Sequence, residues 1–187
     1  TSQGRKIFMV DLKIVDDNGK RLPEDGKSIG NLYIRGNTIA GGYYNNKEAS
    51  KAAIDDEGYF RTGDVASLDE QGFLRLTDRA KDLIKSGGEW ISSIDLENRA
   101  MSHPDVENCA VIAIPHEKWD ERPLLVVVPA EGKKPSKDEL IKHLEGHFAK
   151  WQMPDDVVYE DELPLTATGK VSKLTLRQKY ENYTLAS

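Results

Sequence analysis

Short alternations of apolar and polar residues fill positions 1–77 and predict β-strands joined by tight turns. Segments 16–19 and 69–72 each start with Asp and end with Gly, so both predict hairpin turns. Residues 46–54 have a helical pattern, with Ala49, Ala52 and Ala53 on a face of small side chains. The expected strands are residues 7–10, 12–15, 31–36, 65–68 and 73–76. We therefore expect a β-rich, barrel- or ribbon-like subdomain.

A different pattern begins at residue 84, where helical spacing alternates with continuous apolar runs. Ser92 predicts the start of one helix, and Ser136 with Glu139 forms a capping box for a second. Further expected elements are strands at residues 109–114, 123–128 and 157–159 and a last helix at residues 171–183. The helix faces expected to be apolar are Ile94 and Met101, then Leu140, Leu144, Phe148 and Trp151, then Leu176, Tyr180 and Tyr183.

Together these patterns predict an α+β protein in two parts. Residues 1–78 form the β-rich subdomain, residues 79–83 a hinge, and residues 84–187 a small domain with an antiparallel sheet flanked by helices. The length of 187 residues fits two modest cores.

Composition narrows the functional classes. The chain has 26 Lys and Arg against 32 Asp and Glu, and the net charge of −6 disfavours general binding to nucleic acid or anionic membranes. No apolar run approaches the roughly 20 residues that cross a bilayer. The single cysteine, Cys109, excludes an internal disulfide framework and favours a cytoplasmic setting. Because Thr1 is neither an initiator Met nor part of a signal-peptide pattern, we expect a chain cut from a longer one.

Two glycine-containing segments are candidates for ligand binding. In residues 61–64, the Asp64 carboxylate can accept hydrogen bonds from the two hydroxyls of a ribose. The alternative is that Gly63 only makes a turn and Asp64 bonds its own backbone. In residues 85–90, Gly87 and Gly88 allow backbone N–H groups to approach a ligand closely. The alternative is a plain loop that leads into the Ser92 helix.

A third candidate is Lys170, which follows a glycine on a polar loop. Its ammonium can reach a carboxylate or a phosphate, although a solvated surface lysine is the alternative. His143 and His147 stand four apart on a helix, but no third ligand is evident, so we expect surface histidines and no metal site. Cys109 lies within an apolar run and is expected in the core.

Four segments resemble the carboxyl-terminal part of AMP-forming acyl-CoA synthetases of the fatty-acid type, within the adenylate-forming enzymes. Residues 30–45 are similar to the stretch G-E-x-x-x-R-G…G-Y-x-N, with Asn31 in place of the usual acidic residue. Residues 58–64 resemble the motif W/Y-x-x-T-G-D, residues 78–91 the hinge and glycine loop, and residues 164–170 the motif P-x-T-x-x-G-K. The four occur in the family's order and cover nearly the whole chain.

This resemblance implies a reaction and a role for each candidate. A carboxylic acid, of medium or long chain by the overall likeness, reacts with ATP to give an acyl-adenylate, and the acyl group then passes to CoA. Lys170 is implied to stabilise the carboxylate and α-phosphate, Asp64 and Arg79 to bind the nucleotide with Trp90 near it, Lys81 to be the hinge, and Gly87 and Gly88 to line the pantetheine channel.

The chain lacks two further motifs of that family, the phosphate loop that ends in P-K-G and the aromatic-Gly-x-T/S-E segment. The resemblance places adenine contacts and the Mg²⁺-binding Glu in the second of these. We therefore expect the Mg²⁺ ligands in the rest of a large domain, which would be this chain's partner, and no catalysis by the chain alone. The alternatives are an adenylation domain that loads a carrier protein, a luciferase-like relative, and a non-catalytic nucleotide-binding or interaction module.

Overall fold

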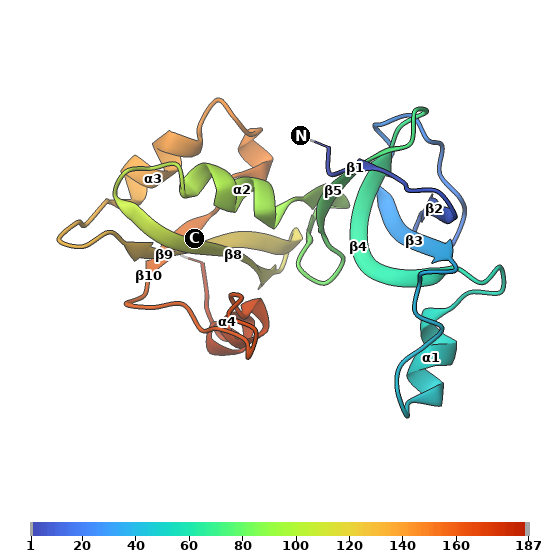
Figure 1. The fold of residues 1–187 in the computed structure, drawn as a ribbon. Helices are drawn as coiled ribbons and strands as arrows, with labels where there is room; N and C mark the ends of the chain where they lie inside the picture. The colour runs from blue at the N-terminus through green and yellow to red at the C-terminus, as the bar shows by residue number, and fades with distance from the viewer. Residues whose placement is uncertain (1, 186–187) are drawn as a thin grey trace. The chain divides into compact units, whose positions relative to one another are not determined.

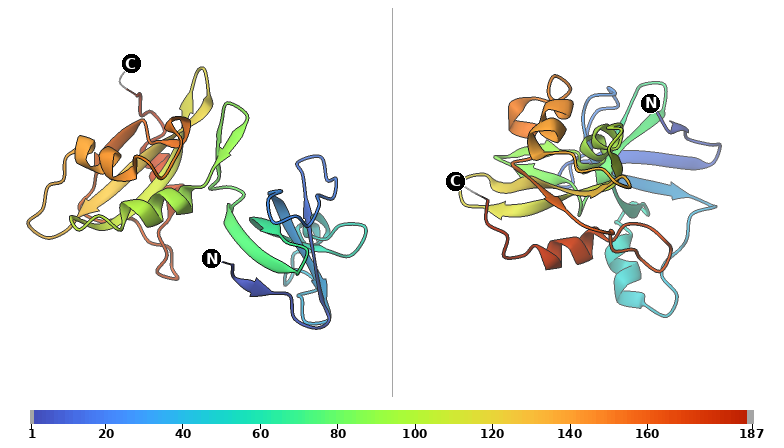
Figure 2. Two further views of the ribbon diagram at one scale, coloured as in Figure 1. Left: turned by 90° about the horizontal axis from the view of Figure 1, so that it is seen from above. Right: turned by 90° about the vertical axis from the view of Figure 1, so that its left-hand side faces the viewer.

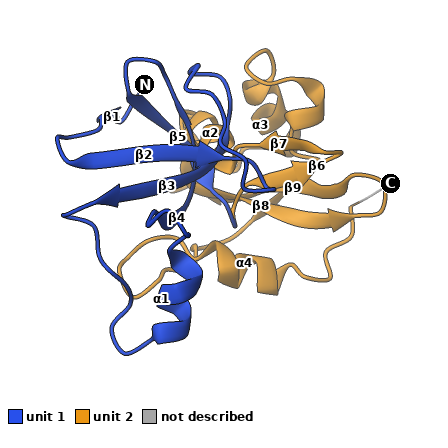
Figure 3. Cartoon of the chain, turned by 90° about the vertical axis from the view of Figure 1, so that its right-hand side faces the viewer, with its two compact units in different colours: residues 1–81 blue, residues 82–187 orange. Residues whose placement is uncertain are grey.

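The computed structural model describes residues 2–185. The chain divides into two compact units, residues 1–81 (unit 1) and residues 82–187 (unit 2) (Figure 3). Each unit has its own sheet and its own hydrophobic core, and helices and strands are mixed in both. The predicted α+β class is therefore confirmed.

Unit 1 is built on a five-stranded antiparallel sheet in the order β1-β5-β4-β3-β2 (Figure 1). The strands are β1 (Gly4–Arg5), β2 (Val10–Val15), β3 (Gly30–Gly36), β4 (Phe60–Leu68) and β5 (Phe73–Arg79). Side chains of alternating positions, such as Leu12 and Ile14, form the core, whereas Lys13 points away from them to Asp55 and Glu57. The two edge strands of the sheet are β1 and β2, so the sheet is open. Of the expected barrel- or ribbon-like forms, unit 1 has the ribbon-like one.

Two local expectations in unit 1 have opposite outcomes. Asn46 begins helix α1 (Lys47–Ala53) as expected, because its side chain accepts a hydrogen bond from the Ala49 backbone N–H. The strand expected at residues 7–10 is wrong, since residues 7–9 make a turn in which the Val10 N–H bonds to the Ile7 carbonyl. Phe8 is 92% exposed there, so its apolar character reflects no core position.

The sheet of unit 2 is organised around β9 (Asp120–Pro129). One edge of β9 pairs along its length with antiparallel β8 (Val106–His116). The other edge pairs first with β6 (Ile84–Ser86), at Ser86 and Asp120, and then with β10 (Asp156–Tyr159). The β10 pairing is parallel, so the expected antiparallel sheet is in fact mixed. Strand β7 (Glu89–Ile91) completes a hairpin with β6.

Helices cover both faces of this sheet (Figures 1 and 2). Helices α2 (Ser93–Ala100) and α3 (Lys137–Leu144) pack over Leu125 and Val127. Helix α4 (Lys173–Lys179) packs over Leu124 and Val126 through Leu176. Because successive strand side chains point to opposite faces, alternate residues of β9 serve two separate cores.

The starts of α2 and α3 were predicted correctly, whereas several helix faces and ends were not. Ser92 and Ser136 cap α2 and α3 as expected, the latter in a capping box. The buried face of α2 is Ser93, Leu96 and Ala100, while Ile94 and Met101 are exposed. Helix α3 ends at Leu144, so Phe148 and Trp151 lie beyond it, the latter in the 3-10 helix η1 (Lys150–Gln152). Helix α4 is also shorter than the expected residues 171–183.

Candidate functional site

Asp64 and Arg79 lie opposite each other on the neighbouring strands β4 and β5. The Arg79 guanidinium donates from Nε to Asp64 Oδ1 at 3.3 Å, and the backbone N–H of Ala80 donates to the Gly63 carbonyl at 2.9 Å. About 29% of the Asp64 side chain and 58% of the Arg79 side chain remain exposed. The pair therefore offers a carboxylate acceptor and a guanidinium donor side by side, which suits a ligand with both hydroxyls and phosphates.

The segment around Asp64 is a strand and not the turn that the sequence suggested. Residues 61–64 lie inside β4, with Gly63 at φ +78° and an irregular register just after it. The Asp64 N–H donates to Thr62 Oγ1, and the Thr62 hydroxyl donates to the Leu32 carbonyl on β3, each at 3.0 Å. Thr62 therefore fixes the backbone of Asp64 against the neighbouring strand.

Lys81 is exposed and is the last residue of unit 1. It lies in the turn that follows β5, inside the segment expected to be a hinge. The hinge role of Lys81 stays a prediction.

Gly87 and Gly88 form the two-residue turn of the β6–β7 hairpin, with φ of +59° and +88°. The Gly87 N–H donates to the Trp119 carbonyl at 2.9 Å, and a Cβ atom on Gly87 would lie 2.9 Å from Trp119 Cε3. Glycine is thus needed at position 87 for close approach as well as for the turn. Trp90 lies on β7, is 38% exposed, and has Lys85 Nζ 5.5 Å from its ring centre.

A pocket of about 300 Å³ lies beside this hairpin and was missed by sequence reasoning. Its walls include two indoles, those of Trp119 and Trp151, which are 42% and 43% exposed. Exposed indoles present flat apolar faces that can pack against a planar ring. The remaining lining residues are Ser86, Gly87, Glu89, Arg122 and Asp155. The signal that could have indicated this pocket is a tryptophan in the polar segment 116–122.

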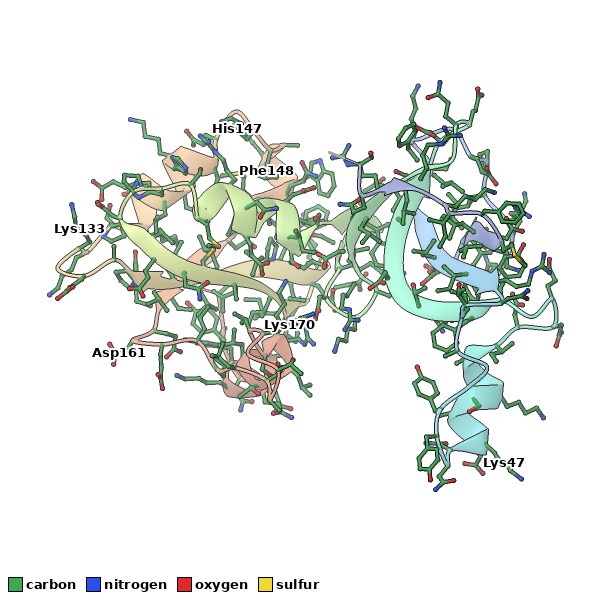
Figure 4. The ribbon with its side chains drawn as sticks, in the orientation of Figure 1. Lys47, Lys133, His147, Phe148, Asp161 and Lys170 are labelled. Atoms are coloured by element: carbon green, nitrogen blue, oxygen red, sulfur yellow. The ribbon has the colours of Figure 1, made fainter. Side chains whose placement is uncertain are left out.

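Lys170 ends a tight turn just before α4 (Figure 4). The Thr166 N–H donates to the Lys170 carbonyl at 2.7 Å, and the Lys170 N–H donates to Thr166 Oγ1 at 3.2 Å. Within the described chain, the Lys170 ammonium forms no ion pair and no side-chain hydrogen bond, and the residue is exposed. The backbone of the turn is therefore fixed, while the cationic side chain is available to an anion.

Other candidates contribute no further chemistry. Cys109 is 4% exposed, and burial raises the pKa of its thiol to about 12, so the expectation of a core cysteine is confirmed. Among residues 2–185, no three His, Cys, Asp or Glu side chains are grouped so that they could hold a metal ion. His143 instead lies 2.9 Å from the Ser102 hydroxyl. No helix within the same residues is long and apolar enough to cross a membrane.

The sequence is similar to several known proteins. Residues 95–170 match the family model described as the AMP-binding enzyme C-terminal domain. The chain is 53% identical over 181 residues to a long-chain-fatty-acid–CoA ligase of Thermus thermophilus, covering 96% of this chain and 33% of that protein. It is 52% identical over 181 residues to a 3-methylmercaptopropionyl-CoA ligase of Ruegeria lacuscaerulensis, with coverage of 97% and 33%.

A solved structure is similar as well. The crystal structure of ATP-bound MatB from Rhodopseudomonas palustris superposes with a TM-score of 0.86 at 32% identity, covering 97% of this chain and 36% of that one. The fold and residues 95–170 thus match the carboxyl-terminal domain of AMP-binding enzymes. Over nearly its whole length the chain is similar to CoA ligases, and it spans about a third of the length of the curated relatives it matches.

Proposed function

We propose that these residues are the carboxyl-terminal part of a ligase that converts a carboxylic acid, ATP and CoA into an acyl-CoA, AMP and pyrophosphate. One structural observation supports this proposal in addition to the sequence similarity. Unit 2 presents Lys170 and the Gly87–Gly88 hairpin on separate loops, and no hydrogen bond or ion pair joins the two within the described residues. A rotation of unit 2 about residues 79–83 would bring one loop to a reaction centre and withdraw the other.

In the first half-reaction, a carboxylate oxygen attacks the α-phosphorus of ATP and the bond to pyrophosphate breaks. Two anions approach each other in this step, so a cation placed between them lowers the barrier. Lys170 supplies that cation in our proposal because its ammonium is exposed and unpaired within the described chain. Asp64 and Arg79 hold the ribose hydroxyls and the nucleotide, and Trp90 lies near it.

In the second half-reaction, the CoA sulfur bonds to the acyl carbon, AMP leaves with the electrons of the broken bond, and the thiol proton passes to solvent. We propose that the Gly87–Gly88 hairpin lines the path of the pantetheine arm. The neighbouring indoles of Trp119 and Trp151 then offer a surface for the adenine ring of CoA. Support comes from Gly88, where nothing lies within 4 Å of a Cβ position, so the hairpin backbone is open on that side.

The fatty-acid class of substrate is part of the proposal and rests on the names of the relatives. Those names also differ, since a long-chain fatty acid and 3-methylmercaptopropionate are activated by relatives of nearly equal identity, 53% and 52%. The third of each relative that this chain matches therefore does not determine which acid is the substrate. No group of residues described here fits Mg²⁺, so we assign it no step in this chain and propose that its ligands belong to a large partner domain. A cytoplasmic location completes the proposal, in line with the lone buried cysteine.

The test is acid-dependent release of AMP by the full-length gene product with ATP, Mg²⁺, CoA and a panel of carboxylic acids. Asp64→Asn keeps the shape of the side chain and removes the charge, so we expect a rise of about tenfold in the KM for ATP. Asp161→Asn changes an exposed carboxylate of the other unit, unit 2, and should leave that KM unchanged (Figure 4). We expect no AMP release by the 187-residue chain alone.

Two results would contradict the proposal. One is AMP release that does not depend on an acid, and the other is an unchanged KM for ATP in Asp64→Asn. Replacing CoA by a carrier protein with a phosphopantetheine arm tests the alternative acceptor. Faster acyl transfer to the carrier than to CoA would favour an adenylation domain that loads carrier proteins.

A further inference from the structure

Arg122 occupies a break in the edge of β9. On this edge β6 pairs at Asp120 and β10 begins to pair at Leu124, so no described strand pairs with residue 122 there, whereas β8 pairs with it on the opposite edge at Ile114. Arg122 is nevertheless only 6% exposed. A buried guanidinium is costly unless its donors find acceptors, and in this break most of the acceptors come from the segment 151–155 and not from a strand.

The side chain makes five hydrogen bonds that fill this break. Nε and Nη2 donate to the two carboxylate oxygens of Asp155, at 2.8 and 2.6 Å. Nη1 donates to Ser86 Oγ at 2.9 Å and to the Trp151 carbonyl at 2.5 Å. Nη2 also donates to the Met153 carbonyl at 3.0 Å. One planar group thus joins β9 to the end of β6 and to the segment 151–155.

Ser86, Trp151 and Asp155, which bind Arg122, also line the pocket that contains the two indoles. Ser86 directly precedes Gly87, whose N–H binds the Trp119 carbonyl, and Trp151 carries the second indole. A change at Arg122 would therefore reach the backbone under both indoles. Other ion pairs of unit 2 do not reach the pocket lining: Lys133–Asp105, Lys137–Asp156, Lys173–Glu97, Arg177–Asp82 and Lys179–Glu160.

Stability alone does not require arginine here, because apolar residues of similar volume often replace a buried ion pair without loss. Arginine has a property that lysine lacks, since its planar fork reaches acceptors in several directions at once. We infer that Arg122 is a positioning residue that sets the spacing of the Trp119 and Trp151 indoles. This spacing in turn sets the affinity for the adenine end of CoA. The inference rests on the proposed function.

The experiment compares Arg122→Lys and Arg122→Met in the full-length gene product. We expect the KM for CoA to rise about tenfold in Arg122→Met and less in Arg122→Lys, because the lysine can keep part of the network. Acid-dependent exchange between ATP and pyrophosphate, which needs no CoA, should stay within about twofold of the wild type. Asp155→Asn, which keeps the shape and loses the charge, should shift the KM for CoA in the same direction.

Lys173→Met is the matched control. Lys173 forms an ion pair with Glu97 at 2.7 Å, with side chains only 13% and 17% exposed, and it lies outside the pocket. We expect this variant to lower the melting temperature and leave the KM for CoA unchanged. Arg122 and Asp155 variants that lower the melting temperature with an unchanged KM for CoA would overturn the inference.

A second readout needs no ligase activity. In the 187-residue chain labelled with ¹⁵N, Arg122→Lys should shift the indole N–H resonances of both Trp119 and Trp151. Unchanged resonances would overturn the positioning role even if the enzyme is active. Conversely, shifted resonances in a protein without acid-dependent AMP release would support the positioning role and contradict the proposed function, so the two failures are distinguishable.

Discussion

At the scale of single residues, His143 shows how burial and neighbouring charges set a proton equilibrium. Its Nε2 lies 2.9 Å from the Ser102 hydroxyl, and its ring meets that of His103 edge to face with centroids 5.0 Å apart. Burial, and then the charges of Arg99 and His103, lower the pKa of His143 below its ordinary value of 6.5. The folded state therefore favours the neutral imidazole.

This shift predicts a pH dependence of stability. Below pH 6.5 the unfolded chain binds a proton at His143 more readily than the folded chain does, so the stabilising contribution is present above 6.5 and is lost as the pH falls. We expect the free energy of unfolding of unit 2 to drop between about pH 7 and pH 5, and to drop less in His143→Phe. Urea unfolding at several pH values measures this, and parallel profiles for the two proteins would contradict it.

Residues of the candidate site could be predicted where a single short sequence motif contains them. Asp64, Lys170 and the two glycines each stand in a motif that can be read locally, although the motif around Asp64 proved to be a strand. Arg122, Trp119 and Trp151 belong to segments that meet only in the folded chain. No spacing in the sequence indicates that a side chain on β9 binds carbonyl groups near residue 152.

At the scale of elements, local chemistry fixed the starts of helices better than their ends. Ser92 and Ser136 were recognisable caps because each side chain binds an N–H group of its own first turn. The apolar spacing of Leu140 and Leu144 continues to Phe148, which extended the expected helix too far. The helix stops because Glu145 leaves the helical conformation and Gly146 follows at φ +79°.

The two glycines of the β6–β7 hairpin allow a prediction about stability in which Gly88→Ala is the control for Gly87→Ala. Alanine at position 87 or 88 meets a positive φ, so each variant should lose about 1 kcal/mol of stability. Only at Gly87 would the new Cβ also lie 2.9 Å from Trp119, whereas nothing lies within 4 Å of that position at Gly88. We expect Gly87→Ala to lose about 1 kcal/mol more than Gly88→Ala. Equal losses in thermal unfolding would contradict the close approach of Gly87 to Trp119.

At the scale of the whole molecule, the two units have separate cores and carry different parts of the proposed site. Unit 1 holds Asp64 and Arg79, and unit 2 holds Lys170 and the glycine hairpin. The sequence predicted two parts because the apolar period changes from that of strands to that of helices and buried runs. For unit 2 it predicted an antiparallel sheet and missed the parallel strand β10. The direction of β10 depends on the long connection from β9, which no local sequence pattern indicates.

In the proposed function, Lys170 serves adenylation and not thioester formation. The most direct measurement is Lys170→Ala in the full-length gene product, with each half-reaction assayed separately. We expect acid-dependent ATP–pyrophosphate exchange to fall about 10²- to 10³-fold, while transfer of the acyl group from supplied acyl-adenylate to CoA stays within about threefold. The control Lys134→Ala, at another exposed lysine of unit 2, should leave both rates unchanged. Equal loss of both half-reactions in Lys170→Ala, or loss of neither, would contradict the role of Lys170 in adenylation alone.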